Sequence, residues 1–216
     1  MNFIKTSLYS GISTAISLLV RLISNKIVAV YLGTNGIFLL GQLKDFLRLS
    51  NVLSGFGIEN GIIKYTSQFQ ESDEELKKIL STSFRIHLIF SLIFSILILF
   101  FSNIISEYLS LDFESKFYFL VLSISVISFS IHTLLMSIIN GIKRIKLYVT
   151  INVVSVVISA IIMITLVLKY AVIGALYALI INQIITLAVT CILFYLYKPF
   201  KISLLFSSFD FNYFKK

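Results

Sequence analysis

Four basic side chains in the first two apolar segments of the chain could bind an anion inside a membrane. Arg21 and Lys26 lie in the first segment, and Lys44 and Arg48 lie in the second. One such charge at the centre of a membrane helix costs about 2.5 to 3.5 kcal/mol on insertion scales, so several close together usually serve a function. Arginine offers phosphate a planar, permanently charged fork, and lysine offers a mobile point charge. These residues therefore predict a hydrated cationic cavity that binds a phosphate or pyrophosphate group.

Polar side chains at helical spacing accompany these cations. A stripe of such residues should face protein or water instead of lipid. In the first segment the stripe consists of Ser10, Thr14, Ser17, Arg21 and Asn25, and in the second Lys44, Arg48 and Asn51 share a face beside Gln42 and Asp45. Asn25, Gln42, Asp45 and Asn51 are therefore predicted to line the cavity, and Asp45 can offset part of the charge of Arg48 three residues later.

A second interpretation of the basic residues is purely structural. Long cationic side chains can snorkel toward the headgroups or pair with one another, and they then only pin the helices. Lys26 lies near the end of its segment and fits this interpretation best. His132 in the middle of a later segment could take up a proton during a transport cycle, although a hydrogen-bonded histidine that serves packing is the commoner case.

The composition indicates an all-α integral membrane protein. Of the 216 residues, 58% are hydrophobic and only 13% are charged, and the mean hydropathy is +0.98, so a soluble domain of this size would lack polar surface. The net charge of +8 does not indicate nucleic acid, because the basic residues occupy short connectors without a recognisable binding motif. Cys191 is the single cysteine and has no cysteine partner for a disulfide or metal site. Neither a cofactor nor a metal is expected, and the absence of catalytic motifs argues against an enzyme.

Six segments are long and apolar enough to span a membrane, which needs about 20 residues each. They cover residues 7–31, 37–58, 84–106, 117–140, 149–168 and 172–196. Basic residues concentrate on one series of connectors, whereas the opposite series carries only Lys116 and Lys169. The positive-inside rule therefore predicts that both termini are cytoplasmic. A cleavable signal peptide is not expected, because Arg21 and Lys26 interrupt the first apolar stretch.

Two connectors have the pattern of helices that lie on the membrane surface. Ser72 and Glu75 match a capping box ahead of an apolar face formed by Leu76, Ile79 and Leu80, which predicts a short interfacial helix. After Pro199 the apolar residues again recur at helical spacing between lysines. The chain is thus divided into a six-helix lobe over 1–196 and a cytoplasmic interfacial helix over 197–216, the start of a linker to a second lobe. Solvated loops with incidental periodicity are the alternative for both.

Several sequence stretches resemble the N-terminal half of Wzx-type flippases. They are KTSL at 5–8, KIVAVYLGTNG at 26–36, GFGIENGIIKYTSQF at 55–69 and the acidic-then-basic ESDEELKKIL at 71–80. The resemblance is distinctive over the first third of the chain, and the later segments match in hydropathy. It implies one lobe of a two-lobe exporter fold of the multidrug, oligosaccharidyl-lipid and polysaccharide exporter superfamily.

The resemblance also implies a function. Wzx-type flippases carry undecaprenyl-pyrophosphate-linked oligosaccharide units across the bacterial inner membrane. These units are used for surface polysaccharides such as the O-antigen of lipopolysaccharide or enterobacterial common antigen. Arg21, Lys44 and Arg48 are the residues expected to meet the pyrophosphate. Lys26 is a further candidate, although the similar motif that contains it does not by itself assign it a role. The expected partners are this anionic lipid-linked oligosaccharide, membrane lipids and a second lobe, without nucleic acid. A multidrug or other small-molecule exporter of the same superfamily is the first alternative, and a membrane scaffold subunit that transports nothing is the second.

Overall fold

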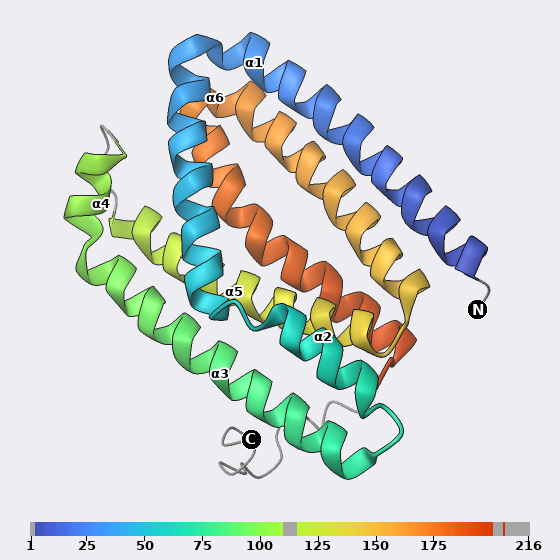
Figure 1. Ribbon diagram of the computed structural model, residues 1–216. Helices are drawn as coiled ribbons and strands as arrows, with labels where there is room; N and C mark the ends of the chain where they lie inside the picture. The colour runs from blue at the N-terminus through green and yellow to red at the C-terminus, as the bar shows by residue number, and fades with distance from the viewer. Residues whose placement is uncertain (1–2, 110–115, 201–204, 206–216) are drawn as a thin grey trace.

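The chain forms a bundle of long helices. The computed structural model describes residues 3–109, 116–200 and 205, with side chains from Tyr9 onward (Figure 1). The helices are α1 (Phe3–Gly55), α2 (Glu59–Gln68), α3 (Asp73–Phe100), α4 (Ser102–Tyr108), α5 (Lys116–Gly141) and α6 (Ile145–Tyr197). No strand occurs among the described residues. The all-helical class predicted from the sequence is therefore confirmed.

Helices α1 and α6 each contain one sharp bend. Gly33 in α1 has φ 64° and ψ −169°, and Ala171 in α6 has φ 48° and ψ −127°. Figure 1 shows that both helices fold back on themselves at these points. The two bends touch, because a Cβ built on Gly36 would lie 3.1 Å from Cγ2 of Val172. The bends fall in the breaks that the sequence predicts at 32–36 and 169–171.

Four helices are long and apolar enough to cross a membrane. They are Tyr9–Gly55, Asp73–Phe100, Lys116–Gly141 and Ile145–Tyr197. The chain is therefore a multi-pass membrane protein. Only four candidates are found among the described residues because α1 and α6 each count as one helix through their bend. Six spans, a two-lobe fold and cytoplasmic termini therefore stay predictions.

The surface helix predicted after Ser72 is not a separate element. The Ser72 hydroxyl accepts a hydrogen bond from the Glu75 amide at 3.5 Å, so the predicted cap is present. The helix that it starts then continues to Phe100 without a break. No glycine or proline occurs over these 28 residues, and nothing else interrupts the backbone hydrogen bonds between the cap and the apolar part. The helix therefore begins well before residue 84, where the third apolar segment starts in the sequence.

The end of the third segment also differs from the sequence prediction, whereas the end of the last segment agrees with it to within one residue. The third segment was expected to run to residue 106, but α3 ends at Phe100, and the short helix α4 follows after Phe101. At the other end of the chain α6 stops where Lys198 takes a left-handed conformation ahead of Pro199, as expected because the residue before a proline disfavours the helix. The interfacial helix predicted over 197–216 lies almost wholly outside the described residues.

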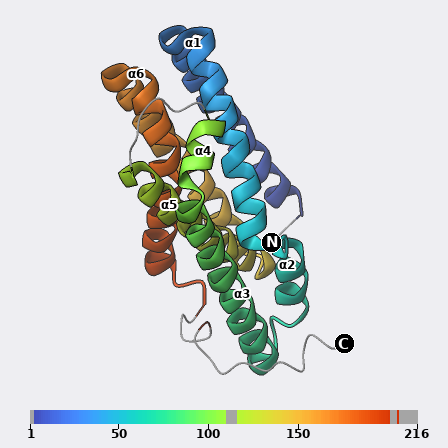
Figure 2. The same cartoon turned by 90° about the vertical axis from the view of Figure 1, so that its left-hand side faces the viewer.

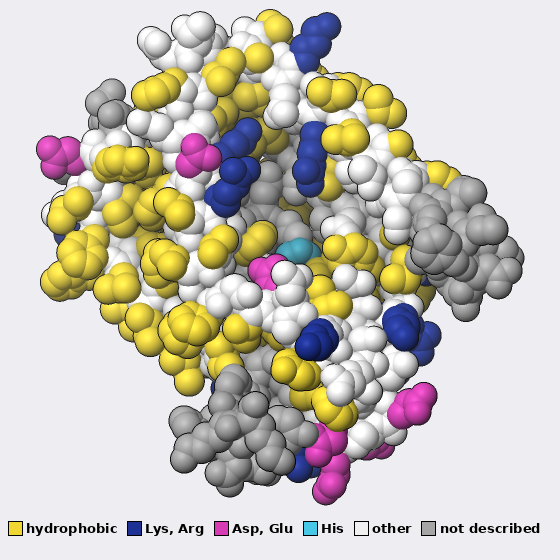
Figure 3. All heavy atoms as spheres, in the orientation of Figure 1, with side chains coloured by type: hydrophobic (Ala, Val, Ile, Leu, Met, Phe, Trp, Pro, Cys, Tyr) yellow, Lys and Arg dark blue, Asp and Glu magenta, His cyan; other side chains and the backbone are white. Residues whose placement is uncertain are grey.

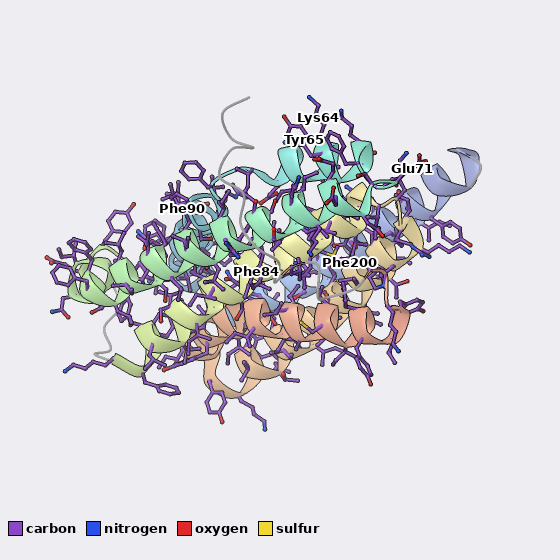
Figure 4. The ribbon with its side chains drawn as sticks, turned by 90° about the horizontal axis from the view of Figure 1, so that it is seen from below. Lys64, Tyr65, Glu71, Phe84, Phe90 and Phe200 are labelled. Atoms are coloured by element: carbon purple, nitrogen blue, oxygen red, sulfur yellow. The ribbon has the colours of Figure 1, made fainter. Side chains whose placement is uncertain are left out.

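Helix α2 is held on α5 by a close contact between backbones. A Cβ on Gly141, the last residue of α5, would lie 2.7 Å from Cβ of Thr66 and 3.1 Å from the carbonyl oxygen of Ile63. Thr66 is buried on the same side of α2, whereas Lys64 and Tyr65 are exposed and project outward from the bundle (Figure 4). Figure 2 shows α2 beside the lower parts of α1 and α3. This packing fixes Glu59, the first residue of α2, against the interior.

Candidate functional site

A cavity of about 450 Å³ opens between α1, α5 and α6. Both halves of α1 and both halves of α6 contribute to its wall, so the two bends described above determine its shape. Figure 3 shows the hollow, with Lys and Arg side chains on both sides of it and a His and an acidic side chain at its lower edge. We call it the cationic cavity. Its polar and charged lining consists of Arg21, Ser24, Asn25, Lys44, His132, Asn152, Ser155, Ser159, Asn182 and Thr186.

The structure brings four of the sequence-predicted site residues into this wall. Arg21 and Asn25 come from the first half of α1, Lys44 from its second half, and His132 from α5. Both cationic side chains are also exposed, so they remain hydrated at the open side of the cavity. Arg21 and Asn25 are four residues apart, which places them on one helical face, as predicted.

Five other predicted site residues do not line the cavity. Lys26, Asp45 and Arg48 are exposed outside its wall. The side-chain oxygens of Gln42 and Asn51 are buried and have no hydrogen-bond partner among the described residues. Lys26 follows Arg21 by five residues, which turns it well away from that face at 3.6 residues per turn. Arg48 lies one turn beyond Lys44. A binding role for these five residues stays a prediction.

The cationic cavity carries a net positive charge. Arg21 and Lys44 are its charged side chains, and no acidic side chain occurs among the described residues that line it. Within the described part of the chain, neither Arg21 nor Lys44 forms an ion pair, and Asp45 and Arg48 do not pair with each other. The charges of Arg21 and Lys44 are therefore available to an anionic ligand.

A polar stripe on α6 forms the wall opposite these cations. Asn152, Ser155 and Ser159 follow one another at helical spacing on the first half of the helix. Nδ2 of Asn182, on the second half, donates a hydrogen bond to the Ser159 carbonyl at 3.4 Å and so ties the two halves together. Oγ of Ser155 and Oδ1 of Asn182 have no partner in the described structure. Both atoms are buried, while the stripe as a whole places polar side chains opposite the cations.

The hydrogen bonds around His132 identify which of its ring nitrogens carries the proton. Its Nδ1 lies 2.8 Å from Oγ1 of Thr190. The Thr190 hydroxyl donates its single hydrogen to the carbonyl of Thr186, also at 2.8 Å, so it can only accept from the histidine. Nδ1 of His132 therefore carries the proton, and Nε2 is left as an acceptor. His132 thus forms a packing hydrogen bond with Thr190 and also lines the cavity. Its uptake of a proton during transport stays a prediction.

His87, the other histidine of the chain, serves packing. It is fully buried, and its Nδ1 lies 2.9 Å from Oγ of Ser130. The Ser130 hydroxyl also lies 3.3 Å from the carbonyl oxygen of Ser54. The three residues thereby join α3, α5 and the end of α1 below the cationic cavity.

A smaller cavity of about 200 Å³ adjoins the cationic one. Phe129, His132 and Asn152 line both, so the two spaces meet at these side chains. Glu59 from α2 supplies the acidic group of the smaller cavity, and burial raises the pKa of this carboxyl above its usual range. We call this space the Glu59 chamber. Its other polar residues are Thr133, Ser137, Asn140 and Tyr148.

Residues 39–215 match a family model described as polysaccharide biosynthesis protein. This match covers most of the chain. The chain belongs to the polysaccharide biosynthesis protein family. It is also 31% identical over 83 residues to the lipid III flippase of Escherichia coli K12 and, to the same extent, to the lipid III flippase of Shigella flexneri. The aligned part covers 38% of this chain but spans only about a fifth of these relatives, 20% of each. No solved structure matches the chain.

Sequence reasoning missed two parts of the site in this polysaccharide biosynthesis protein. The stripe of Asn152, Ser155 and Ser159 has the same spacing as the stripe in the first segment, and that spacing was the available signal. Single amides such as Asn152 and Asn182 in apolar segments usually form helix-to-helix hydrogen bonds, so they do not by themselves indicate a cavity. Glu59 was read as part of a connector, and its only signal was an acidic residue directly after an apolar segment.

Proposed function

We propose that this protein helps to flip undecaprenyl-pyrophosphate-linked oligosaccharide units across the bacterial inner membrane, for O-antigen or a related surface polysaccharide. The chain would form one lobe around the transport path, and a second lobe would complete it. Membership of the polysaccharide biosynthesis protein family supports the substrate class. The relatives named lipid III flippase support lipid-linked transport in general. The cationic cavity among membrane helices is the observation that carries the proposal.

The chemistry of the cavity fits an anion that must cross an apolar layer. A pyrophosphate loses its hydration on entering a membrane, and hydrogen-bonding cations can replace that hydration. The Arg21 guanidinium can bind two phosphate oxygens side by side. The Lys44 ammonium, on the other half of α1, can supply a mobile point charge to the same anion. Hydroxyl and amide groups of α6 can satisfy the remaining oxygens. Transport of this kind breaks no covalent bond, so the proposal requires no catalytic residue.

The alternatives differ in the charge that they require. An exporter of cationic drugs would need an apolar or acidic cavity, whereas Arg21 and Lys44 make this one cationic. A scaffold subunit would direct its charges toward partner chains, whereas these two side chains face a shared hollow. The flippase is therefore the better supported function.

Ligand binding tests the proposal directly. The 216-residue chain in nanodiscs of neutral lipid should bind undecaprenyl pyrophosphate at least about a hundredfold more tightly than undecaprenol, since two charge-assisted contacts are at stake. Native mass spectrometry or competition with a labelled lipid gives both dissociation constants. Equal affinity for the two lipids, or preference for an organic cation such as tetraphenylphosphonium, would reject the function.

Cysteine accessibility tests the proposed topology. With Cys191 replaced by serine, single cysteines at Ser72 and Lys143 should be shielded from an impermeant thiol reagent in intact cells. Cysteines at Thr34 and Lys169, next to the two bends, should be labelled, because the bends are expected on the periplasmic side. All four positions are exposed in the structure. Protection at Thr34 and Lys169 would mean that α1 and α6 do not each cross the membrane twice.

A further inference from the structure

The Glu59 chamber has a different chemistry from the cationic cavity that it adjoins. Its lining contains one carboxylate, one imidazole, two amides and several hydroxyls, with Phe129, Ile63 and Met136 between them. Most of its described lining residues carry polar side chains that can donate or accept hydrogen bonds, which suits a small polar molecule without net charge. No arginine or lysine occurs among its described lining residues. A second phosphate is therefore a poor fit.

The size of the chamber limits its occupant. About 200 Å³ corresponds to roughly seven water molecules at about 30 Å³ each. That space is generous for a dehydrated metal ion, which needs several oxygens at about 2.0 to 2.6 Å. No group of three or more His, Cys, Asp or Glu residues that could hold a metal occurs in the described part of the chain. A unit about as large as one sugar ring fits better.

The hydrogen-bonding groups of the chamber match the hydroxyls of a sugar. The Glu59 carboxylate can only accept while ionised, and Nε2 of His132 accepts because its Nδ1 already donates to Thr190. Asn140 and Asn152 both donate and accept through their amides. Sugar hydroxyls supply donors and acceptors in the same mixture, and Phe129 offers a flat apolar surface for the ring.

The position of the chamber connects it to the pyrophosphate. Phe129, His132 and Asn152 line both cavities, so the two spaces adjoin at these three side chains. Beyond the lipid-linked pyrophosphate, the next group of the substrate is the sugar attached to it. Resting on the proposed function, we infer that the Glu59 chamber binds this first sugar and selects a neutral or amino sugar over an acidic one.

The selection follows from the charge of Glu59. An ionised carboxylate accepts hydrogen bonds from neutral hydroxyls but repels a second carboxylate at short distance. Burial raises the pKa of Glu59, so the discrimination requires a pH above that raised pKa, and the repulsion then acts through a medium that screens less than water. A sugar that differs only by oxidation of its C6 hydroxymethyl group to a carboxylate therefore probes this repulsion, and a Glu59 variant isolates the contribution of Glu59.

The experiment compares three lipids on the full chain in neutral nanodiscs: polyprenyl pyrophosphate, polyprenyl-pyrophosphoryl glucose and polyprenyl-pyrophosphoryl glucuronate. The wild type should bind the glucosyl lipid about tenfold more tightly than the bare pyrophosphate, and the glucuronyl lipid no more tightly than the bare one. Glu59→Gln should not weaken binding of the bare lipid, because it removes a negative charge beside an anion, and it should bring the two sugar lipids within about twofold of each other. Asn140→Ala should lose most of the gain from glucose.

Glu74→Gln is the matched control, because it removes the same charge from an exposed position at the start of α3. It should leave all three dissociation constants unchanged. Tight binding of the bare lipid without a preference for glucose over glucuronate would overturn the sugar site and leave the proposed function standing. Discrimination that persists in Glu59→Gln would also overturn it. Failure to bind any of the three lipids would reject both.

Discussion

Replacing both Arg21 and Lys44 with alanine is expected to weaken binding of undecaprenyl pyrophosphate by about two to four orders of magnitude. A hydrogen bond to a charged group contributes about 1.5 to 3 kcal/mol, which is one to two decades for each side chain. The two cations lie on different halves of α1 and line one cavity, so each single variant should lose about one to two decades. Dissociation constants of the variants in neutral nanodiscs check the prediction.

The loss of binding should depend both on the positive charge at these positions and on the shape of the group that carries it. Arg21→Lys should recover binding only in part if the guanidinium holds two phosphate oxygens, because an ammonium group cannot form that paired contact. Raising the salt concentration should weaken the wild type more than the double alanine variant, since the double variant has lost the charges that salt would screen.

Two further variants separate the cavity from the chain's general positive charge. Lys116→Ala removes one cation from an exposed position at the start of α5, and it should change binding less than twofold. Arg48→Ala should have a smaller effect than Lys44→Ala, because Arg48 does not line the cavity. Equal losses for Lys44→Ala and Lys116→Ala would show that binding follows net charge and that the cavity has no specific role.

In cells the same double variant should insert normally and fail in transport. Removing a cation from membrane depth lowers the cost of insertion, so the amount of protein in the membrane should not fall. Surface glycan made by a flippase-null strain that carries the variant within its complete gene should drop sharply when normalised to that amount. Normal glycan would mean that Arg21 and Lys44 only pin helices.

The sequence predicted one wall of the cavity because helical periodicity is a local property. Arg21 and Asn25 share a face whatever the rest of the chain does, and Lys44 was identified by the energetic cost of its charge in an apolar segment. The opposite wall depends on which helices pack together. The Asn152 stripe on α6 and Glu59 on α2 come close to these cations only through the bends in α1 and α6 and the contact of Gly141 with Thr66.

The bends and ends of the helices also have two kinds of cause, the local sequence and tertiary packing. The break near Gly33 was visible in the sequence, since glycine readily takes the positive φ found there. Ala171 takes a positive φ as well, although alanine disfavours it, so tertiary packing must impose the bend in α6. In α3 a correct cap at Ser72 was mistaken for the start of a separate surface helix, because a cap marks where a helix begins and carries no information about where it ends.

The bend in α6 is also the place where one methyl group should have the largest effect on stability. A Cβ added to Gly174 would overlap the carbonyl oxygen of Leu166 and lie 2.9 Å from Cβ of Tyr170. The obstacle is backbone, so no side-chain rotation can relieve it. Gly174→Ala is therefore expected to destabilise the protein by about 3 kcal/mol, the upper end for overpacking, or roughly 6 to 12 °C in melting temperature for a chain of this size.

Gly41→Ala is the matched control for that prediction. Gly41 also lies within a long helix, but a Cβ there would meet nothing within 4 Å, and alanine favours the helix over glycine by about 1 kcal/mol. This variant should melt at the same temperature as the wild type or slightly above it. Because Gly174 sets the angle between the two halves of α6, its alanine variant should also separate Asn182 from Ser159 and weaken binding of undecaprenyl pyrophosphate. An unchanged melting temperature for Gly174→Ala would show that the two halves of α6 are not held together at this contact.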